Sequence, residues 1–403
     1  MALLKNPLVY YREAFAGLSR EIWLLSLVSL INRSGAMVLP FLTVYLTHQL
    51  HFSLTDAGWI MSAFGAGSIV GSFLGGQLSD RLGYYRVVLY SLLSSGVMFL
   101  LLTQVSGFGG FAGGIFLTSL LADAFRPASM VAVTAYSRPE NRARSIGLIR
   151  LAINLGFSVG PALGGFLAGH YGYQWLFVID GLTCIGAGFF FWRALPPRPA
   201  ADGIEKPVPA PGARRAVYRD GVFGFFLLIQ LLTTLVFMQV FSTVPVYFKG
   251  EMGLSESGLG LLMAVNGILI VLIEMPLIMI LERYLGTAAL VGLGAALIGL
   301  GYLGLLLPGG AWSVGLVFIA GITVGEMINF PFSNNFAMGR GPEGGQGAYL
   351  GLYTMSFSLA HILSPLLGTY IAAHGSFDLL WLLGGALAIL AGAGAMLLRR
   401  HTG

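Results

Sequence analysis

The chain has 403 residues, of which 56% are hydrophobic and only 10% are charged. Soluble domains carry about 25% charged residues, so this composition excludes soluble enzymes, nucleic-acid binders and disordered chains. It indicates a polytopic α-helical membrane protein, for which the net charge of +5 is a signal of topology rather than of a nucleic-acid partner.

Twelve apolar runs are each long enough to cross a hydrocarbon core of about 30 Å, which takes around 20 helical residues. The first six cover residues 22–46, 56–78, 85–105, 110–135, 145–168 and 173–194. The second six cover residues 222–248, 257–281, 287–307, 312–338, 348–373 and 378–398. Charges of both signs precede the first run, which favours a retained span over a cleaved leader.

A charged, proline-rich stretch separates the two sets of six spans and predicts a solvated linker. We therefore expect an N-terminal six-helix bundle over residues 1–195, a cytoplasmic linker over 196–220 and a C-terminal six-helix bundle over 221–403. With the N-terminus in the cytoplasm, nearly all Lys and Arg residues outside the spans fall on the cytoplasmic side. The sequence thus predicts a multi-pass protein of the cell membrane with both termini cytoplasmic.

The two halves carry an internal repeat with a constant offset of 204 positions. The matched pairs are Pro127 with Pro331, Gly147 with Gly351, Pro161 with Pro365, Gly164 with Gly368, and His170 with His374. Because each half has six spans, both halves keep the same orientation. The pattern predicts parallel repeats about an axis along the membrane normal, with a substrate site at the midplane between them.

The connection between the second and third spans carries a recognisable motif. Its residues are Gly76, Asp80, Arg81, Gly83 and Arg86, with Tyr84 and Tyr85 where basic residues are usual. This pattern resembles the loop signature G-x-L-x-D-R-x-G-R-[RK] of the major facilitator superfamily. The resemblance implies two six-helix bundles related by pseudo-two-fold symmetry, and it implies gating or structural roles for these five residues.

The fifth span carries a second motif, in which Gly156, Gly160 and Gly164 line one helix face and Pro161 adds a kink. It resembles the G-x-x-x-G-P-x-x-G-G signature of the antiporter branch of the same superfamily. The resemblance implies that this face packs against a helix of the other half and helps to seal the outer side. Plain small-residue packing is the alternative interpretation.

Several charged residues fall inside the predicted spans, where a charge costs at least a few kcal/mol and needs an explanation. Asp123 and Glu326 lie midway along the fourth and tenth spans, and we predict that they couple transport to protons. Arg33 and Arg126 are the expected partners of Asp123. The alternative is a fixed network of ion pairs that only positions helices.

Two further residues are candidates for proton coupling. His361 lies midway along the eleventh span and is expected either to modulate Glu326 or to serve as a packing residue. Glu274 precedes Pro276 in the eighth span, and it is expected either to be a second coupling site or to pair with arginines of the inner gate.

The family resemblance implies a cavity lined by the first, fourth, seventh and tenth spans. Aromatic, methionine and amide side chains there suit an amphipathic organic solute. The candidates for substrate binding are Asn32, Met37, Tyr45, Gln230, Met238, Gln239, Phe241, Asn329, Phe330, Asn334 and Asn335. Met and Phe are also common on packing and lipid-facing surfaces, so packing is the alternative role.

These features favour a secondary transporter, not an enzyme, that exports amphipathic or lipophilic small molecules in exchange for protons by alternating access. The sequence holds no G-x-x-x-x-G-K-[ST] loop and no Cys/His cluster, so we expect a proton gradient to drive transport without a cofactor or metal. Protons, a small-molecule substrate and membrane lipids are the expected partners of a monomer.

Two alternatives remain open. One is proton-coupled uptake of a small polar solute or peptide. Against peptide symport, Ser29 and Asn32 replace both acidic residues of the E-x-x-E-R pattern that precedes the arginine in that family. The other alternative is export of a specific lipid or metabolite.

Overall fold

The computed structural model describes residues 17–35, 37–199, 217–341 and 346–398, and every regular element within these ranges is helical. Twelve stretches of helix are long and apolar enough to cross a membrane, and each overlaps a run predicted from the sequence. The all-helical, twelve-span fold class is therefore confirmed. Residues 200–216, which are most of the predicted linker, and the basic residues of both termini lie outside the described residues.

The chain divides into two compact units. Within the described residues, the first comprises 17–35, 37, 66–160 and 174–199, and the second comprises 38–65, 161–173, 217–341 and 346–398. Segments 38–65 and 161–173 thus pack with the second unit. The boundaries expected at residues 195 and 221 stay a prediction.

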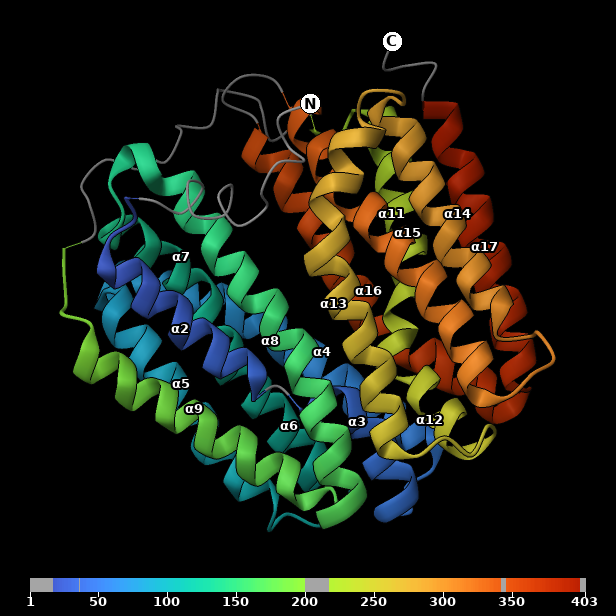
Figure 1. Cartoon of the computed structure of the whole chain (residues 1–403), viewed down its shortest axis with the longest axis horizontal. Helices are drawn as coiled ribbons and strands as arrows, with labels where there is room; N and C mark the ends of the chain where they lie inside the picture. Colours follow the sequence, from blue (N-terminus) through green and yellow to red (C-terminus); the bar gives the residue numbers. More distant parts are fainter. Residues whose placement is uncertain (1–16, 36, 200–216, 342–345, 399–403) are drawn as a thin grey trace. The chain divides into compact units, whose positions relative to one another are not determined.

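The first unit contains α2 (Arg20–Ser34), α5 (Tyr84–Leu102), α6 (Phe108–Asp123), α7 (Phe125–Tyr136), η2 (Pro139–Asn141) and α9 (Gln174–Ala194) (Figure 1). The second contains α3 (Val38–Val44), η1 (Tyr45–Gln49), α11 (Gly221–Phe237), η3 (Met238–Phe241), α12 (Thr243–Gly250), α13 (Glu256–Leu281), α14 (Thr287–Gly304), α15 (Ala311–Arg340), α16 (Gln346–His374) and α17 (Phe377–Leu398). Helices α4 (Leu54–Leu82) and α8 (Arg142–Tyr171) contribute a part to each unit.

Three predicted spans are interrupted: the first between α2 and α3, and the fourth and seventh at positions where a proline explains the interruption. Pro127 has no N–H to donate to the carbonyl of Asp123 four residues earlier, and α6 ends at Asp123. The Ser72 hydroxyl donates to that carbonyl instead, at 3.5 Å. In the seventh span, Pro245 likewise leaves the Phe241 carbonyl without its helical donor, and the helix breaks into α11, η3 and α12.

The internal repeat is visible as two matching helix contacts built on glycine. In the first unit, a Cβ on Gly96 of α5 would lie 2.7 Å from the carbonyl oxygen of Gly181 on α9. In the second unit, a Cβ on Gly299 of α14 would lie 2.6 Å from the carbonyl oxygen of Gly385 on α17. Gly181 and Gly385 are 204 positions apart, the offset of the sequence repeat, and Gly96 and Gly299 are 203 apart. Both pairs of helices approach so closely that only glycine fits.

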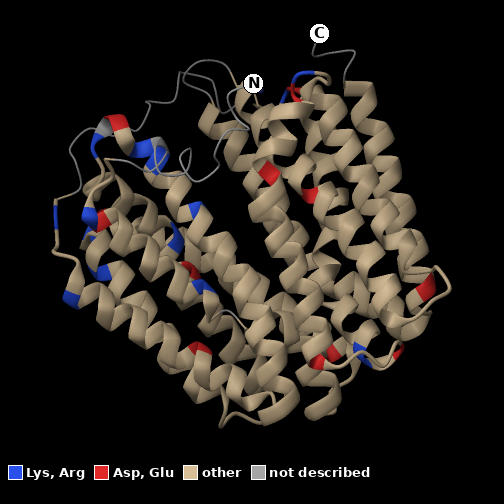
Figure 2. Ribbon diagram, viewed as in Figure 1, with Lys and Arg blue, Asp and Glu red and all other residues tan. Residues whose placement is uncertain are grey.

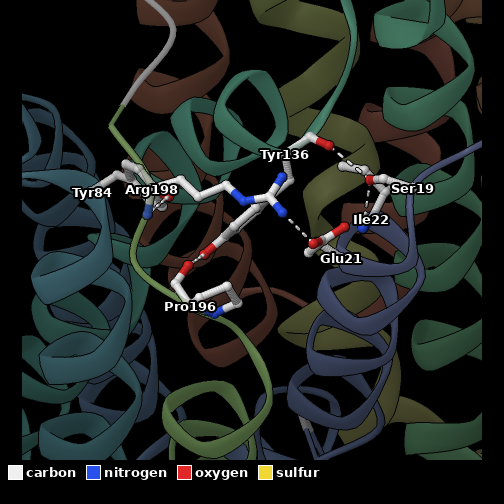
Figure 3. A network of polar contacts seen from close by, with 7 residues as sticks. All are labelled: Ser19, Glu21, Ile22, Tyr84, Tyr136, Pro196 and Arg198. Atoms are coloured by element: carbon white, nitrogen blue, oxygen red, sulfur yellow. Dashed lines mark hydrogen bonds and ion pairs between the residues drawn. The ribbon is translucent and has the colours of Figure 1, made fainter.

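At one end of the first unit, the residues after α9 are held against the ends of three helices (Figure 3). The Tyr136 hydroxyl donates to the Pro196 carbonyl at 2.8 Å, and the Arg198 guanidinium pairs with Glu21 and lies 5.8 Å from the centre of the Tyr136 ring. Ser19, the N-cap of α2, donates to the Tyr136 carbonyl at 2.7 Å. The described start of the predicted linker therefore belongs to the packed first unit.

The second unit ties the corresponding helix ends together with an ion pair. Asp220 is the N-cap of α11 and accepts a hydrogen bond from the Phe223 N–H at 3.1 Å. Both of its oxygens also accept from the Arg340 guanidinium, at 2.8 and 3.1 Å, and Tyr349 donates at 3.3 Å. The hydrogen bond from Arg340, chief among these contacts, holds the pKa of Asp220 below its usual range.

Candidate functional site

Charged residues gather at the ends of the helices and in the connections, and few lie along the helices (Figure 2). Those within the helices include the charged residues that the sequence singled out for proton coupling, together with Arg150 in α8 and Asp180 in α9. The structure places Arg33, Asp123 and Arg126 in the first unit, and Glu326 and Glu274 in the second.

Arg33 lies in the last turn of α2 and is held from one side by α8. A Cβ on Gly156 would lie 2.6 Å from the Cβ of Arg33, so the α8 backbone passes directly against this residue. The guanidinium carbon lies 5.3 Å from the centre of the Phe157 ring, a cation–π contact. The Arg33 Nε is shielded from solvent and has no hydrogen-bond acceptor among the described residues.

Asp123 and Arg126 flank the break between α6 and α7, and both interact electrostatically with Arg33. No ion pair within the described residues joins Asp123 to either arginine. The structure therefore brings the three predicted charges into one region of the first unit without locking them into the fixed pairs of the alternative interpretation.

Asn32 and Met37, two of the residues predicted to bind substrate, lie on either side of the break in the first span, and both form hydrogen bonds to α9. The Asn32 amide donates to the Cys184 sulfur at 3.5 Å. The Met37 N–H donates to both carboxylate oxygens of Asp180, at 3.0 and 3.1 Å, and the Met37 side chain is buried. Asp180 is 1% exposed, and it supplies the acceptor that a buried backbone N–H between two helices requires.

Glu326 lies midway along α15 and has a neutral partner. The Asn266 side chain on α13 donates to Glu326 Oε1 and, at 2.8 Å, to the Thr323 hydroxyl one helical turn away. No ion pair within the described part of the chain involves Glu326. A carboxyl held by an amide can keep its place whether it is ionised or protonated, whereas a carboxyl bound to arginine is held in its charged form.

Two amides of the predicted cavity join a buried network on α11 and α15. Ser333 donates to Gln230 Oε1 at 2.8 Å, and the Gln230 amide donates to Thr234 at 3.2 Å. The Asn329 amide donates to the Val291 carbonyl at 2.9 Å. Gln230 and Asn329 are completely buried, so the structure places them in the interior of the second unit.

Gln239 lies in η3, where the seventh span breaks, and both the nitrogen and the oxygen of its side-chain amide form hydrogen bonds. Its nitrogen donates to the Ser364 carbonyl and hydroxyl at 2.7 and 2.9 Å. Its oxygen accepts from Ser242 and Thr243 at 3.2 and 2.7 Å. These four hydrogen bonds satisfy the irregular backbone and give Gln239 a structural role beside the substrate-binding role predicted for it.

The predicted aromatic and methionine residues occupy different surroundings. The Phe330 ring packs edge-on against Phe237, with centroids 4.9 Å apart, and Phe241 contacts the same ring at 6.3 Å. Met238 is buried in η3, and the buried Tyr45 ring lies 5.9 Å from the Tyr173 ring at a tilt of 38°. Asn334 and Asn335 are both exposed near the end of α15.

His361 and Glu274 do not hydrogen-bond to Glu326 in any contact that the structure gives. The His361 ring stacks on Phe64 of α4, with centroids 6.1 Å apart, and the α4 backbone at Gly65 lies against it. Glu274 interacts electrostatically with Glu326 from α13. The stacking fits the packing role weighed for His361, and the two carboxyls form one acidic region.

The glycine face of the fifth span is buried at Gly156, Gly160 and Gly164, and Pro161 is buried beside it. One position further on, a Cβ on Gly165 would clash with the Glu256 carbonyl oxygen and would lie 3.0 Å from the Cα of Gly260, both on α13. In turn, a Cβ on Gly260 would clash with the Pro161 carbonyl oxygen. Within the second unit, this part of α8 thus packs backbone to backbone against α13.

Next to this contact, a polar cluster joins α8 to the start of α13. The Tyr173 hydroxyl donates to Glu256 at 2.7 Å, and the Lys249 ammonium group pairs with the same carboxylate oxygen at 2.8 Å. Burial, and next the hydrogen bond to Glu256, raises the pKa of Tyr173. Nothing in the sequence motifs pointed to these three residues.

The loop motif between α4 and α5 is largely exposed. Gly83 caps α5 with a φ of 82°, a conformation that glycine adopts without strain. Asp80 and Arg81 lie in the last turn of α4, and Arg86 lies in the first turn of α5. A Cβ on Gly76 would lie 4.0 Å from the Cβ of Pro127.

Sequence reasoning missed the neutral residues that hold the predicted charges. Asn266 and Thr323 carry no motif, and an amide or hydroxyl in an apolar run is too common to signal a partner. Phe157 follows Gly156 in the fifth-span motif, but only the folded structure places its ring against Arg33.

The chain is similar to several bacterial transporters. It is 24% identical to the uncharacterized MFS-type transporter YqjV of Bacillus subtilis over 86% of this chain and 85% of that protein. It is 22% identical to a Na(+), Li(+), K(+)/H(+) antiporter of Planococcus maritimus over 90% and 91%, respectively.

Solved structures share the fold. The peptide transporter POT in complex with sulfate gives a TM-score of 0.80 at 16% identity, with 96% of both chains covered. The nucleoside transporter NupG gives a TM-score of 0.74 at 13% identity, with 94% of this chain and 100% of that chain covered. The family model described as Major Facilitator Superfamily matches residues 22–365. The chain is therefore a multi-pass membrane transporter that belongs to the Major Facilitator Superfamily.

Proposed function

We propose that the protein is a proton-coupled antiporter that exports amphipathic or lipophilic small molecules by alternating access. Glu326 carries the proposal, because it lies midway along a membrane-spanning helix with a neutral amide as its hydrogen-bond partner. Such a carboxyl can exchange a proton without breaking an ion pair. Asp123, beside two arginines and a helix break, is the second proposed coupling carboxyl.

The sites of substrate contact follow from the same arrangement. We propose substrate contact for Asn32 and Met37 in the first unit and, in the second unit, for Tyr45, Phe241, Phe330 and the polar groups of α11 and α15. The amides of Gln230 and Asn329 are already hydrogen-bonded, so their part is to fix the polar interior. Apolar and aromatic side chains would supply most of the contact area.

Transport into liposomes tests the proposal. Purified protein is reconstituted, a pH gradient is imposed, and uptake of lipophilic cations, lipids and peptides is followed. We expect substrate to move against the proton flux, and we expect Glu326→Gln to abolish gradient-driven transport while exchange without a gradient persists. Glu251→Gln, an exposed change of the same kind, is the matched control. Undiminished gradient-driven transport by Glu326→Gln would overturn the coupling role, and substrate movement with the protons would replace antiport by symport.

The same acidic region supports a second candidate, antiport of a monovalent metal cation. The Glu326 carboxylate and the Thr323 hydroxyl oxygen lie around the amide nitrogen of Asn266, and oxygen donors are what small hard cations require. A relative at 22% identity is named as a Na(+), Li(+), K(+)/H(+) antiporter. Addition of Na⁺, Li⁺ or K⁺ to acid-loaded proteoliposomes would release protons if this function holds. We expect Thr323→Val to weaken that response more than Thr354→Val, a control on an exposed face of α16.

For the location, we propose the cytoplasmic membrane, with both termini and residues 196–220 on the cytoplasmic side. Single cysteines introduced at Arg20 and at Pro308 test this orientation in intact cells, with buried Cys184 replaced by alanine. A membrane-impermeant maleimide should label only the cysteine at position 308. Labelling at position 20 alone would reverse the topology.

A further inference from the structure

The first unit holds a guanidinium that lacks an acceptor. The Arg33 Nε is buried, and no hydrogen-bond acceptor contacts it within the described residues. The neighbouring charges are Asp123 and Arg126, so two cations face one carboxylate. The nearby Asp180 is occupied, because both of its oxygens accept from the Met37 N–H.

A cation in this position is costly unless something pairs with it. Removing part of a guanidinium from water is unfavourable when no anion or hydrogen-bond acceptor replaces the lost hydration. The Phe157 ring offsets part of this by cation–π attraction. The ring offers no acceptor to Nε, so the hydrogen-bonding capacity of the guanidinium remains.

The arginine is also held in place before any ligand arrives. Helix α8 lies against its Cβ at Gly156, and the adjacent Asn32 is tied to Cys184 on α9. A donor fixed in this way loses little conformational entropy on binding. The planar guanidinium fork matches a carboxylate in a bidentate geometry, and the Phe157 ring offers an apolar surface beside it.

We propose that the first unit binds an anionic group of the transported molecule through Arg33, with Arg126 adding a second positive charge. This inference rests on the proposed transport function and narrows the substrate to amphipathic organic anions, with a carboxylate as the best-matched group. Asp123 then reduces the net charge of the site, so that the bound anion meets one surplus cation rather than two.

A binding experiment without any gradient tests the inference. The full-length protein in phosphatidylcholine nanodiscs is titrated by calorimetry with matched pairs of carboxylate and primary amide, namely naphthylacetate with naphthylacetamide and hexanoate with hexanamide. We expect at least one carboxylate to bind about tenfold more tightly than its amide, as a charge-assisted hydrogen bond implies. Arg33→Gln should abolish the preference, Arg33→Lys should keep part of it, and Arg126→Gln should reduce it.

Arg20→Gln removes the same charge from an exposed position on α2 and should leave the preference intact. Thermal unfolding of each variant identifies any loss of fold. If Arg33→Gln is unstable, Arg126→Gln, at an exposed position, provides a second test of the carboxylate preference. Equal affinities for every pair in the unaltered protein, or an unchanged preference in folded Arg33→Gln, would overturn the proposal.

Two further arms separate the possible failures. In nanodiscs that contain phosphatidylglycerol, loss of the carboxylate preference would assign Arg33 to a lipid phosphate and overturn the substrate role. Glu251→Gln, a change at an exposed position outside the proposed machinery, should keep the carboxylate preference. Carboxylate binding without gradient-driven transport would contradict only the antiport proposal, and transport of neutral compounds alone would contradict only the anion site.

Discussion

The two units fasten the same helix ends with different chemistry. In the first unit, the N-cap of α2 is Ser19, whose hydroxyl reaches the last residue of α7. In the second, the N-cap of α11 is Asp220. Its carboxylate accepts hydrogen bonds from two guanidinium nitrogens of Arg340, the last residue of α15. Tyr136 and Arg340 are 204 positions apart, so one repeat position contributes a neutral carbonyl in one unit and a cation in the other.

The difference teaches which parts of a duplicated fold are free to change. The glycine contacts of α5 with α9 and of α14 with α17 keep the repeat, because two helix backbones can approach this closely only where the residue is glycine. A tie between helix ends has several solutions, since any donor and acceptor of suitable reach will serve. The first unit keeps an ion pair as well, but it uses Glu21 and Arg198, which follows the last helix of that unit.

The largest effect is expected from removing the carboxylate of the second unit. Asp220→Ala takes away the N-cap of α11 and leaves Arg340 without its partner, which should lower the free energy of unfolding by about 2 kcal/mol. Asp220→Asn keeps a capping acceptor and should cost less. Thermal unfolding in detergent measures both variants, and equal losses would show that the ion pair contributes nothing beyond the cap.

The ionic tie should also make the second unit sensitive to acid. Arg340 lowers the pKa of Asp220 in the folded protein, so the unfolded chain binds the proton more tightly. The stabilisation is therefore present above the unfolded pKa of about 3.9 and is lost as the pH falls through the lower folded pKa. Between about pH 6 and about pH 3, the free energy of unfolding should fall more steeply for the unaltered protein than for Asp220→Asn. Parallel profiles would contradict this.

A smaller effect is expected in the first unit from Ser19→Ala. The substitution removes the cap of α2 and the hydrogen bond to Tyr136, which together should cost about 1 kcal/mol. The loss should not depend on pH between about 4 and 8, because no charge is involved. Ser53→Ala, which removes an exposed hydrogen bond to Asp56, provides a comparison. A pH-dependent loss for Ser19→Ala would show that the two ties are more alike than their geometry indicates.

The smallest effect should come from Arg198→Gln. The Arg198 side chain is 44% exposed, and ion pairs of this kind contribute about 0.2–1 kcal/mol. Added salt should erase most of the difference from the unaltered protein, since exposed pairs are screened. If the loss instead exceeded that of Ser19→Ala and persisted in salt, the stacking on Tyr136 would be the main attachment of this segment.

The sequence was informative wherever one physical requirement dominated. Long apolar runs predicted all twelve spans, and the glycine and proline matches predicted a repeat that the helix contacts bear out. The helix breaks at Pro127 and Pro245 were not predicted. Both lie within spans that were identified by apolar composition, which does not reveal the loss of a single backbone N–H. The partners of the buried charges could not be predicted for a different reason. Asn266 is remote from Glu326 in sequence, and only the packing of α13 on α15 brings them together.

At Gly165, Gly260 and Pro161, α8 and α13 meet through backbone atoms, and the Ser257 hydroxyl donates to the Gly165 carbonyl at 3.3 Å. The two glycines have no side chain that could change rotamer, so the contact at these positions has little means of yielding by degrees when force is applied across it. It can stay closed or come apart, and intermediate separations would leave an unfilled gap on both sides. The abruptness of any rearrangement at this place is thus set by the absence of side chains rather than by their identity.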